Sequence, residues 1–204
     1  MAAARDYAER VFAWLFANAK AHDAKAFTTG PAFASCPEPT IAVSSPDCGA
    51  SGATLGPAYM HAGEGLVPGL RWEGVEGVGE WLLVSEDPDA PLPTPICHGL
   101  YLGIHKDKLS VEQADFTPAE GGKSTHLEGG FYYGQNRLGN VYILPRPLLN
   151  HGIHRYFFDI IALNEPLSPE LIASKPSKEQ VAKAIQGKVL AWGRWVGECE
   201  RKSG

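Results

Sequence analysis

Two carboxylates stand next to prolines in the segment Asp-Pro-Asp-Ala-Pro. Asp87 and Asp89 are the first and third residues of this segment, which ends at Pro91. Proline fixes its own φ angle and lacks a backbone N–H, so the segment is stiff and both carboxylates are fixed in place. A fixed carboxylate can orient an imidazole or take part in acid–base chemistry. A plain proline–aspartate turn would have the same sequence, and this alternative stays open.

Histidines and a tyrosine supply further polar groups. His98 precedes an apolar segment, and His154 and Tyr156 belong to the segment His151-Gly-Ile-His-Arg-Tyr. Alternate residues of a strand share a face, so His154 and Tyr156 are expected to point together and Arg155 away from them. Imidazole and phenol groups suit a phosphate or a carboxylate. The alternative for His98 is a histidine satisfied within the core.

A zinc site is the other chemistry that two nearby histidines suggest. The spacing His151-x-x-His154 would place two imidazoles on one side of a helix, but on a strand these positions face opposite ways. The four cysteines include no Cys-x-x-Cys pair, which favours reduced thiols in a cytoplasmic protein. We therefore expect neither a metal site nor a cofactor.

Short apolar segments predict the strands that must hold these groups. The predicted strands are 41–43, 81–84, 99–104, 155–163 and 189–196. Asp159, within the strongest of them, requires a polar partner or solvent on its face. The polar, glycine-rich residues 105–140 are typical of a long surface excursion.

Two helices are expected at the ends of the chain. Residues 5–20 are amphipathic, with an apolar face that includes Tyr7, Val11, Trp14 and Leu15. We expect this face to pack on the body of the protein, and binding to a partner is the alternative. Near the C-terminus, Ser177-Lys-Glu-Gln is a capping box that begins a second helix.

Composition excludes several classes of protein. The 204 residues are 44% hydrophobic and 20% charged, as in ordinary globular proteins. A net charge of −5 argues against a nucleic-acid surface or a polybasic membrane patch. The longest apolar run, 11–17, is too short to span a bilayer. The segment 63–72 lacks the third glycine of a dinucleotide-binding fingerprint and is expected to be a structural loop.

The sequence resembles the phosphatidylethanolamine-binding protein (PEBP) family, in its bacterial and fungal branch. The motifs that carry the resemblance are Glu-Asp-Pro-Asp-Ala-Pro at 86–91, His98 eleven residues after Asp87, and Gly-Ile-His-Arg-Tyr-Phe-Phe at 152–158. Three further stretches support it, namely 45–49, 64–72 and 187–201.

The resemblance implies a mainly β fold with a large central antiparallel-rich sheet, a smaller sheet and peripheral N- and C-terminal helices. It implies one PEBP-like domain over 1–204, with 1–25 as an N-terminal helical extension. It also implies a small anion pocket at the strand ends. The residues that match the family's pocket are Asp87, Asp89, Pro91, His98, His154 and Tyr156. Arg155 matches a motif arginine, for which we expect an ion pair with an aspartate of the first motif.

The rim of this pocket departs from the family pattern. Arg146 replaces a glycine and Leu148 replaces a proline, while Cys97 and Gly99 replace the aromatic residues that usually flank the pocket histidine. The additional cation of Arg146 makes this residue a further candidate for ligand binding. We expect an acidic ligand different from, and larger than, a simple phospholipid head group.

Two functions are compatible with these residues. The first is binding of a small anionic molecule (phosphate, a phospholipid head group or an organic acid), without nucleic acid and with no protein partner that the sequence identifies. The alternative is an enzyme or auxiliary protein of a fungal secondary-metabolite pathway, like those that make maleidrides. In that case His98 or His154 would be the general acid or base, and Tyr156 and Arg146 would stabilise a developing enolate or carboxylate. Asp87 would orient a histidine. Protease inhibition by a surface loop, known for some relatives, is a third possibility.

Overall fold

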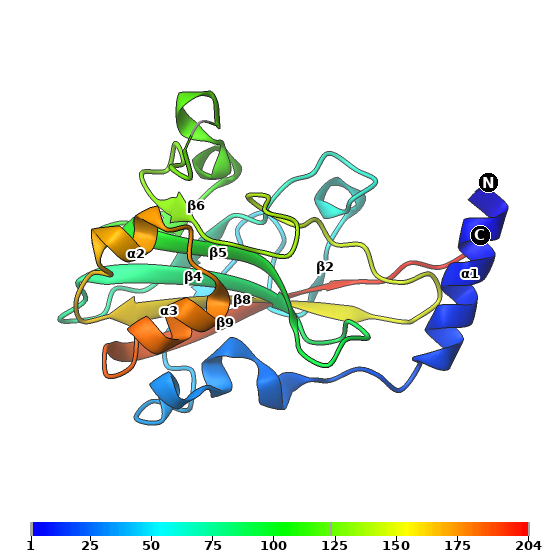
Figure 1. Cartoon of the computed structure of the whole chain (residues 1–204), viewed down its shortest axis with the longest axis horizontal. Helices are drawn as coiled ribbons and strands as arrows, with labels where there is room; N and C mark the ends of the chain where they lie inside the picture. Colours follow the sequence, from blue (N-terminus) through cyan, green and yellow to red (C-terminus); the bar gives the residue numbers. More distant parts are fainter. Residues whose placement is uncertain (1, 123, 204) are drawn as a thin grey trace.

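A six-stranded sheet forms the centre of the protein (Figure 1). The computed structural model describes residues 2–122 and 124–203. The strands lie in the order β2-β9-β8-β4-β5-β7, and neighbours are antiparallel except β2 and β9. Their bounds are β2 Ala53–Thr54, β4 Glu80–Asp87, β5 Ile96–His105, β7 Tyr132–Tyr133, β8 His154–Leu163 and β9 Val189–Cys199.

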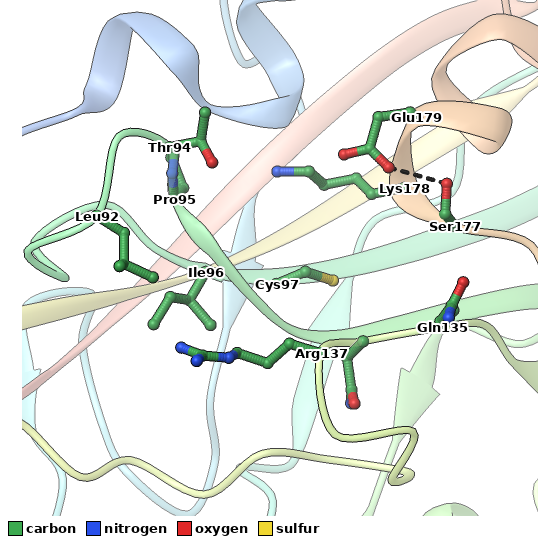
Figure 2. Close-up of a pocket in the computed structure, with 11 residues that line it drawn as sticks. Leu92, Thr94, Pro95, Ile96, Cys97, Gln135, Arg137, Ser177, Lys178 and Glu179 are labelled. Atoms are coloured by element: carbon green, nitrogen blue, oxygen red, sulfur yellow. Dashed lines mark hydrogen bonds between the residues drawn. The ribbon is translucent and has the colours of Figure 1, made fainter.

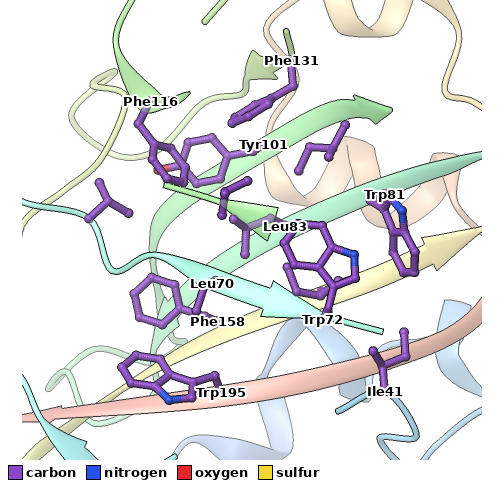
Figure 3. Close-up of a cluster of buried hydrophobic side chains, with 14 of the residues drawn as sticks. Ile41, Leu70, Trp72, Trp81, Leu83, Tyr101, Phe116, Phe131, Phe158 and Trp195 are labelled. Carbon is purple, nitrogen blue, oxygen red and sulfur yellow. The ribbon is translucent and has the colours of Figure 1, made fainter. Parts of the chain in front are cut away.

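A small second sheet covers one face of the large one. It consists of β1 (Val43–Ser44), β3 (Leu70–Trp72) and β6 (Ser110–Val111), in the order β1-β3-β6. Figure 3 shows Trp72 of β3 packed against Trp81 of β4, with the ring centroids 5.8 Å apart. The aromatic residues between the two sheets form the larger of two buried hydrophobic clusters.

Helical segments cover part of the opposite face. Leu82 and Val84 of β4 point to this side and share a second cluster with Val181 and Ile185. Because both faces of β4 are buried, its residues 81–84 are all apolar rather than alternating with polar ones. The α-helices are α1 Ala2–Leu15, α2 Pro169–Ala173 and α3 Lys178–Ala184. The short 3₁₀ helices are η1 Asp23–Lys25, η2 Phe27–Thr29, η3 Pro31–Phe33, η4 Pro57–Tyr59, η5 Gln113–Phe116 and η6 Ala119–Gly122.

The structure confirms the predicted mainly β fold with two sheets. The predicted strands 81–84, 99–104, 155–163 and 189–196 correspond to β4, β5, β8 and β9, and each strand extends beyond its prediction at one end or both. The capping box also forms, because Ser177 and Gln180 exchange hydrogen bonds at the start of α3. Asp159 finds its polar partner in Arg194, at 2.6 Å.

Two predictions were wrong. The residues 105–140 are not a surface excursion, because Phe116, Leu127 and Phe131 from this segment are buried in the larger core cluster. The apolar face expected on 5–20 does not pack on the body: Tyr7 is 71% exposed and Trp14 is 77% exposed. A polar residue and a small one, Glu9 and Ala13, are buried instead.

Helix α1 lies at the end of the sheet opposite α2 and α3, next to the C-terminal segment (Figure 1). It also ends earlier than expected, at Leu15 rather than at residue 20. Within the described part of the chain, none of the helices combines the length and the apolar character needed to cross a membrane.

Candidate ligand-binding site

Three strand termini meet at one end of the large sheet and enclose a cavity of about 300 Å³. β4 ends at Asp87, which pairs with Ile96 at the start of β5. β8, on the other side of β4, begins at His154. The antiparallel register therefore brings together motifs that lie far apart in the sequence. The lining residues are Asp87, Ala90, Pro91, Leu92, Ile96, His98, Arg137, Leu138, Ile143, Leu144, Arg146, Leu148, His154 and Tyr156.

His98 is fixed by its surroundings and keeps one ring nitrogen unpaired. Its Nδ1 lies 2.5 Å from the carbonyl oxygen of Ile143, so this nitrogen must donate. Burial lowers the pKa of His98, which favours the neutral ring. In a neutral ring with a proton on Nδ1, Nε2 is an acceptor. This Nε2 is buried and has no hydrogen-bond partner among the described residues.

Tyr156 stands beside His98 as a hydrogen-bond donor. The two rings meet edge to face, with centroids 5.1 Å apart. Burial raises the pKa of Tyr156 well above its ordinary value, so the group stays a phenol. The cavity therefore presents an acceptor from His98 next to a hydroxyl from Tyr156, with apolar side chains around both.

His154 has both ring nitrogens engaged inside the protein. Nδ1 lies 2.9 Å from Oδ2 of Asp87, and Nε2 lies 2.7 Å from Nδ1 of His151. His151 Nε2 in turn donates to the carbonyl oxygen of Phe16, at 3.0 Å. The contacts therefore form one chain from Asp87 through both rings to the Phe16 carbonyl oxygen. Burial lowers the pKa of His151.

The sequence-based interpretation of His151 was wrong. His151 precedes β8 rather than belonging to it, so strand alternation does not apply, and its ring contacts that of His154 instead of facing away. Gly152, at φ +85°, lets the chain turn between them. The two residues are close in the sequence, but their spacing alone does not show that the rings are hydrogen-bonded to each other.

Asp89 does not line the cavity. Its carboxylate accepts hydrogen bonds from the Arg155 side chain, at 2.8 and 2.9 Å, and from the backbone N–H of Ala21. Asp23 binds the other side of the Arg155 guanidinium, at 2.8 Å. Burial opposes the charge of Asp89, but the bonds from Arg155 outweigh it and lower the pKa. The structure shows the ion pair expected between Arg155 and the first motif.

Arg146 lines the cavity, and it shares the carboxylate of Glu9 with a second arginine. Its guanidinium donates to Glu9 of α1 at 2.5 Å, and Arg201 donates to the other oxygen of Glu9 at 2.9 Å. Burial disfavours the charge of Glu9, but the two arginines hold its pKa below the ordinary value. Pro91 and Leu148 lie on the cavity wall as well, whereas Cys97 is not among its lining residues.

Arg137 is a cavity residue that the sequence did not reveal. Its guanidinium makes no hydrogen bond or ion pair with the described residues, unlike those of Arg146 and Arg155. The neighbouring Asn136 fixes the loop, because its amide donates to the carbonyl oxygens of His98 and Asn140. Arg137 stands in a glycine-rich segment without periodicity, so no pattern in the sequence distinguished it from a surface arginine.

Gly99 explains one of the departures at the rim. A Cβ atom at Gly99 would lie 2.6 Å from the hydroxyl oxygen of Tyr101, so a larger residue would displace that ring. Tyr101 donates to the carbonyl oxygen of Val141 and packs against Phe116.

The residues that the structure describes contain no cluster of three or more His, Cys, Asp or Glu side chains that could hold a metal ion.

Comparison with known proteins agrees with the fold and with the motifs at the cavity. The family model "Phosphatidylethanolamine-binding protein" matches residues 45–200. "Phomoidride biosynthesis cluster protein B" of Talaromyces stipitatus is 42% identical over 198 residues, which cover 95% of this chain and 81% of that protein. A UPF0098 protein of Methanothermobacter thermautotrophicus is 36% identical and covers 70% of this chain and 88% of its own length.

Solved structures show the same fold. YbcL of E. coli, described as a member of the mammalian PEBP family, superposes with a TM-score of 0.67 at 23% identity, over 78% of this chain and 98% of that one. A homologue from Chlamydia trachomatis gives a TM-score of 0.64 at 21% identity, over 80% and 99% of the two chains. On the family match and these relatives, the chain belongs to the phosphatidylethanolamine-binding protein family.

Proposed function

We propose that the protein binds a small acidic molecule, a carboxylic acid or a phosphate monoester, in the cavity between Asp87, His98 and Tyr156. The observation that carries this proposal is the unpaired Nε2 of His98, which is buried at the cavity surface. A buried acceptor without a partner costs about 1–3 kcal/mol, which a ligand that donates a hydrogen to it would recover. An acid or hydroxy acid supplies that donor, and its oxygens accept from Tyr156.

The roles of the other site residues follow from their contacts. Asp87, His151 and His154 bond to one another and shape one wall, so their contribution is to hold the cavity rather than to donate to the ligand. Pro91 and Arg146 border the space, and Asp89 acts through Arg155.

We propose that 1–204 is one domain with 1–25 as its helical extension, and that it works in the cytoplasm.

Calorimetric titration of the full chain tests the binding proposal. The probes are hexanoate, 2-hydroxyhexanoate and inorganic phosphate, on wild type and on His98→Leu and Tyr156→Phe. We expect at least one probe to bind the wild type and each variant to weaken it about tenfold, the value of one lost hydrogen bond to a charged group. Lys106→Gln is the control, because the exposed Lys106 follows the far end of β5 and lines no part of the cavity. Equal affinities in wild type and His98→Leu would contradict the proposal.

General-base catalysis is a second candidate, and the state of His98 favours it. A buried imidazole with a lowered pKa and a free Nε2 can remove a proton from a carbon atom next to a carbonyl group. The Tyr156 hydroxyl would donate to the oxygen of the resulting enolate. The relatives named for a phomoidride biosynthesis cluster support an acidic substrate from a fungal secondary-metabolite pathway.

Exchange of carbon-bound hydrogen for deuterium tests the catalytic candidate. Proton NMR of 2-oxohexanoate in heavy water follows the loss of the hydrogens at C3, since His98 removes a proton and the enolate takes back a deuteron. We expect the wild type to accelerate this exchange and His98→Gln to abolish the acceleration while still binding the probe. An exchange rate that is the same with and without the protein would leave binding as the function.

A further inference from the structure

A second cavity adjoins the first and shares residues with it. Its volume is about 390 Å³. Leu92, Ile96 and Arg137 line both cavities, so the two cavities are neighbouring compartments next to the start of β5. Figure 2 shows the second compartment between β5, the loop that carries Gln135 and Arg137, and the start of α3. The residues that line only this compartment are Thr94, Pro95, Cys97, Gln135, Asn136, Ser177, Lys178 and Glu179.

Each charged group of the second cavity has a polar partner among the described residues, with one exception. Lys178 forms an ion pair with Glu86, whose side chain is fully buried. Glu179 accepts a hydrogen bond from the Ser177 hydroxyl, at 2.8 Å (Figure 2). Arg137 makes no such contact with the described part of the chain. Its guanidinium, which presents five N–H donors, is therefore free to bind an anion where the two cavities meet.

The floor of the second cavity is uncharged. Burial raises the pKa of the Cys97 thiol to about 12, so it stays protonated and is a poor nucleophile. Beside it, Ile96 and Leu92 continue the apolar surface of the first cavity (Figure 2). This surface suits a hydrocarbon chain that passes from one cavity into the other.

We propose that the two cavities form one elongated site for an organic acid with two acidic groups, one at His98 and Tyr156 and the other at Arg137, joined by an apolar chain over Leu92 and Ile96. The inference rests on the proposed binding function and adds the substrate class. The side chain of Asn136 donates to the backbone of His98, so the loop backbone that carries Arg137 is held beside the first anion-binding point. Molecules with one acidic group fill one compartment and leave the other to solvent.

Titrations with acids of matched length test this inference. The probes are the dicarboxylates from succinate to sebacate and the monocarboxylates with the same number of carbon atoms. We expect one or more of the longer dicarboxylates to bind the wild type at least tenfold more tightly than the monocarboxylate of equal length, since an arginine–carboxylate pair is worth about that factor. Arg137→Gln should remove this advantage, and Lys106→Gln, which removes the same charge elsewhere, should preserve it.

A second variant blocks the compartment without altering charge. Gln135 is exposed and lines only the second cavity, so Gln135→Trp should fill it and weaken the longer dicarboxylates about tenfold while leaving butanoate unaffected. Gln186→Trp, at an exposed position outside both cavities, is the matched control. If short acids bind through His98 but dicarboxylates gain nothing, the second subsite is refuted and the proposed function stands. If none of the acids binds, both are refuted.

Discussion

The protonation state of His98 predicts how ligand binding depends on pH. Its Nδ1–H donates a hydrogen bond to the carbonyl oxygen of Ile143, and burial keeps the pKa of the ring below the ordinary value of 6.5. Above about pH 7, the ring is therefore neutral, with its proton on Nδ1 and none on Nε2, and a free carboxylic acid is ionised. A carboxylate oxygen and the lone pair of Nε2 repel each other, so the complex needs one proton between them. Binding of hexanoate then takes up one proton.

The magnitude follows from this count. Uptake of one proton weakens binding tenfold for each unit of pH, or about 1.4 kcal/mol, as the pH rises. Between about pH 7 and about pH 8, the Kd of hexanoate should therefore rise about tenfold. The matched probe 2-hydroxyhexanoate brings its own donor, because its hydroxyl can bond to Nε2 while its carboxylate accepts from Tyr156. Its Kd should stay constant over the same range.

Calorimetry in two buffers with different ionisation enthalpies measures the number of protons taken up directly. We expect one proton for hexanoate and none for 2-hydroxyhexanoate with the wild type. His98→Gln should abolish the uptake, because the amide of glutamine can donate without a change in protonation. A wild-type Kd for hexanoate that is independent of pH would show that His98 does not face the acid, and the reasoning from its orphaned nitrogen would be refuted.

Three further predictions concern stability and the cavity rim. Burial raises the pKa of Glu80 from 4.5 to about 7. Its protonated form therefore stabilises the fold below pH 4.5, and this stability is lost as the pH rises to about 7. Glu80→Gln should remove about 3 kcal/mol of pH dependence from the free energy of unfolding over that range. In Gly193→Ala the Cβ would lie 2.1 Å from the Ile41 carbonyl oxygen, so we expect the free energy of unfolding, measured by chemical denaturation, to fall by about 3 kcal/mol. Gly56→Ala is the control and should lose no stability, because its Cβ would meet open space. Glu9→Gln removes the carboxylate that pairs with Arg146, so phosphate should bind about tenfold more tightly in a titration. Unchanged affinity would show that Arg146 does not reach the ligand.

The strands could be predicted because burial on two faces leaves a clear mark in the sequence. The run 81–84 is apolar throughout because Trp81 and Leu83 face the small sheet while Leu82 and Val84 face the helices. For helix α1 the same reasoning failed. Its apolar residues predicted packing on the body, but the hydrogen bonds to the body come from Glu9 and, just after the helix, from the Phe16 carbonyl oxygen, and their partners lie far along the chain.

The sequence predicted which residues form the site, but it did not predict which of their side chains face the ligand and which hydrogen-bond to other side chains. The motifs identified Asp87, His98, His154 and Tyr156, and the structure brings these four together around one cavity. Whether an imidazole faces the ligand or another side chain depends on the contact of His151 with His154 and on the backbone around Ile143. These are tertiary contacts, and the order of residue types along the chain carries no direct signal for them.

Charge pairing decides which ligand the cavity can accept. Within the described residues, Arg155 pairs with Asp89 and Asp23, which offset its charge. Arg146 shares the single carboxylate of Glu9 with Arg201, so its charge is only partly offset. What remains open is an acceptor nitrogen, a phenol and the guanidinium of Arg137. A fully ionised head group would need donors at every oxygen, which this arrangement does not supply. An acid that keeps or carries a hydroxyl hydrogen at one end and a carboxylate at the other matches each open group with its complement, and the pH dependence of hexanoate against 2-hydroxyhexanoate tests that match.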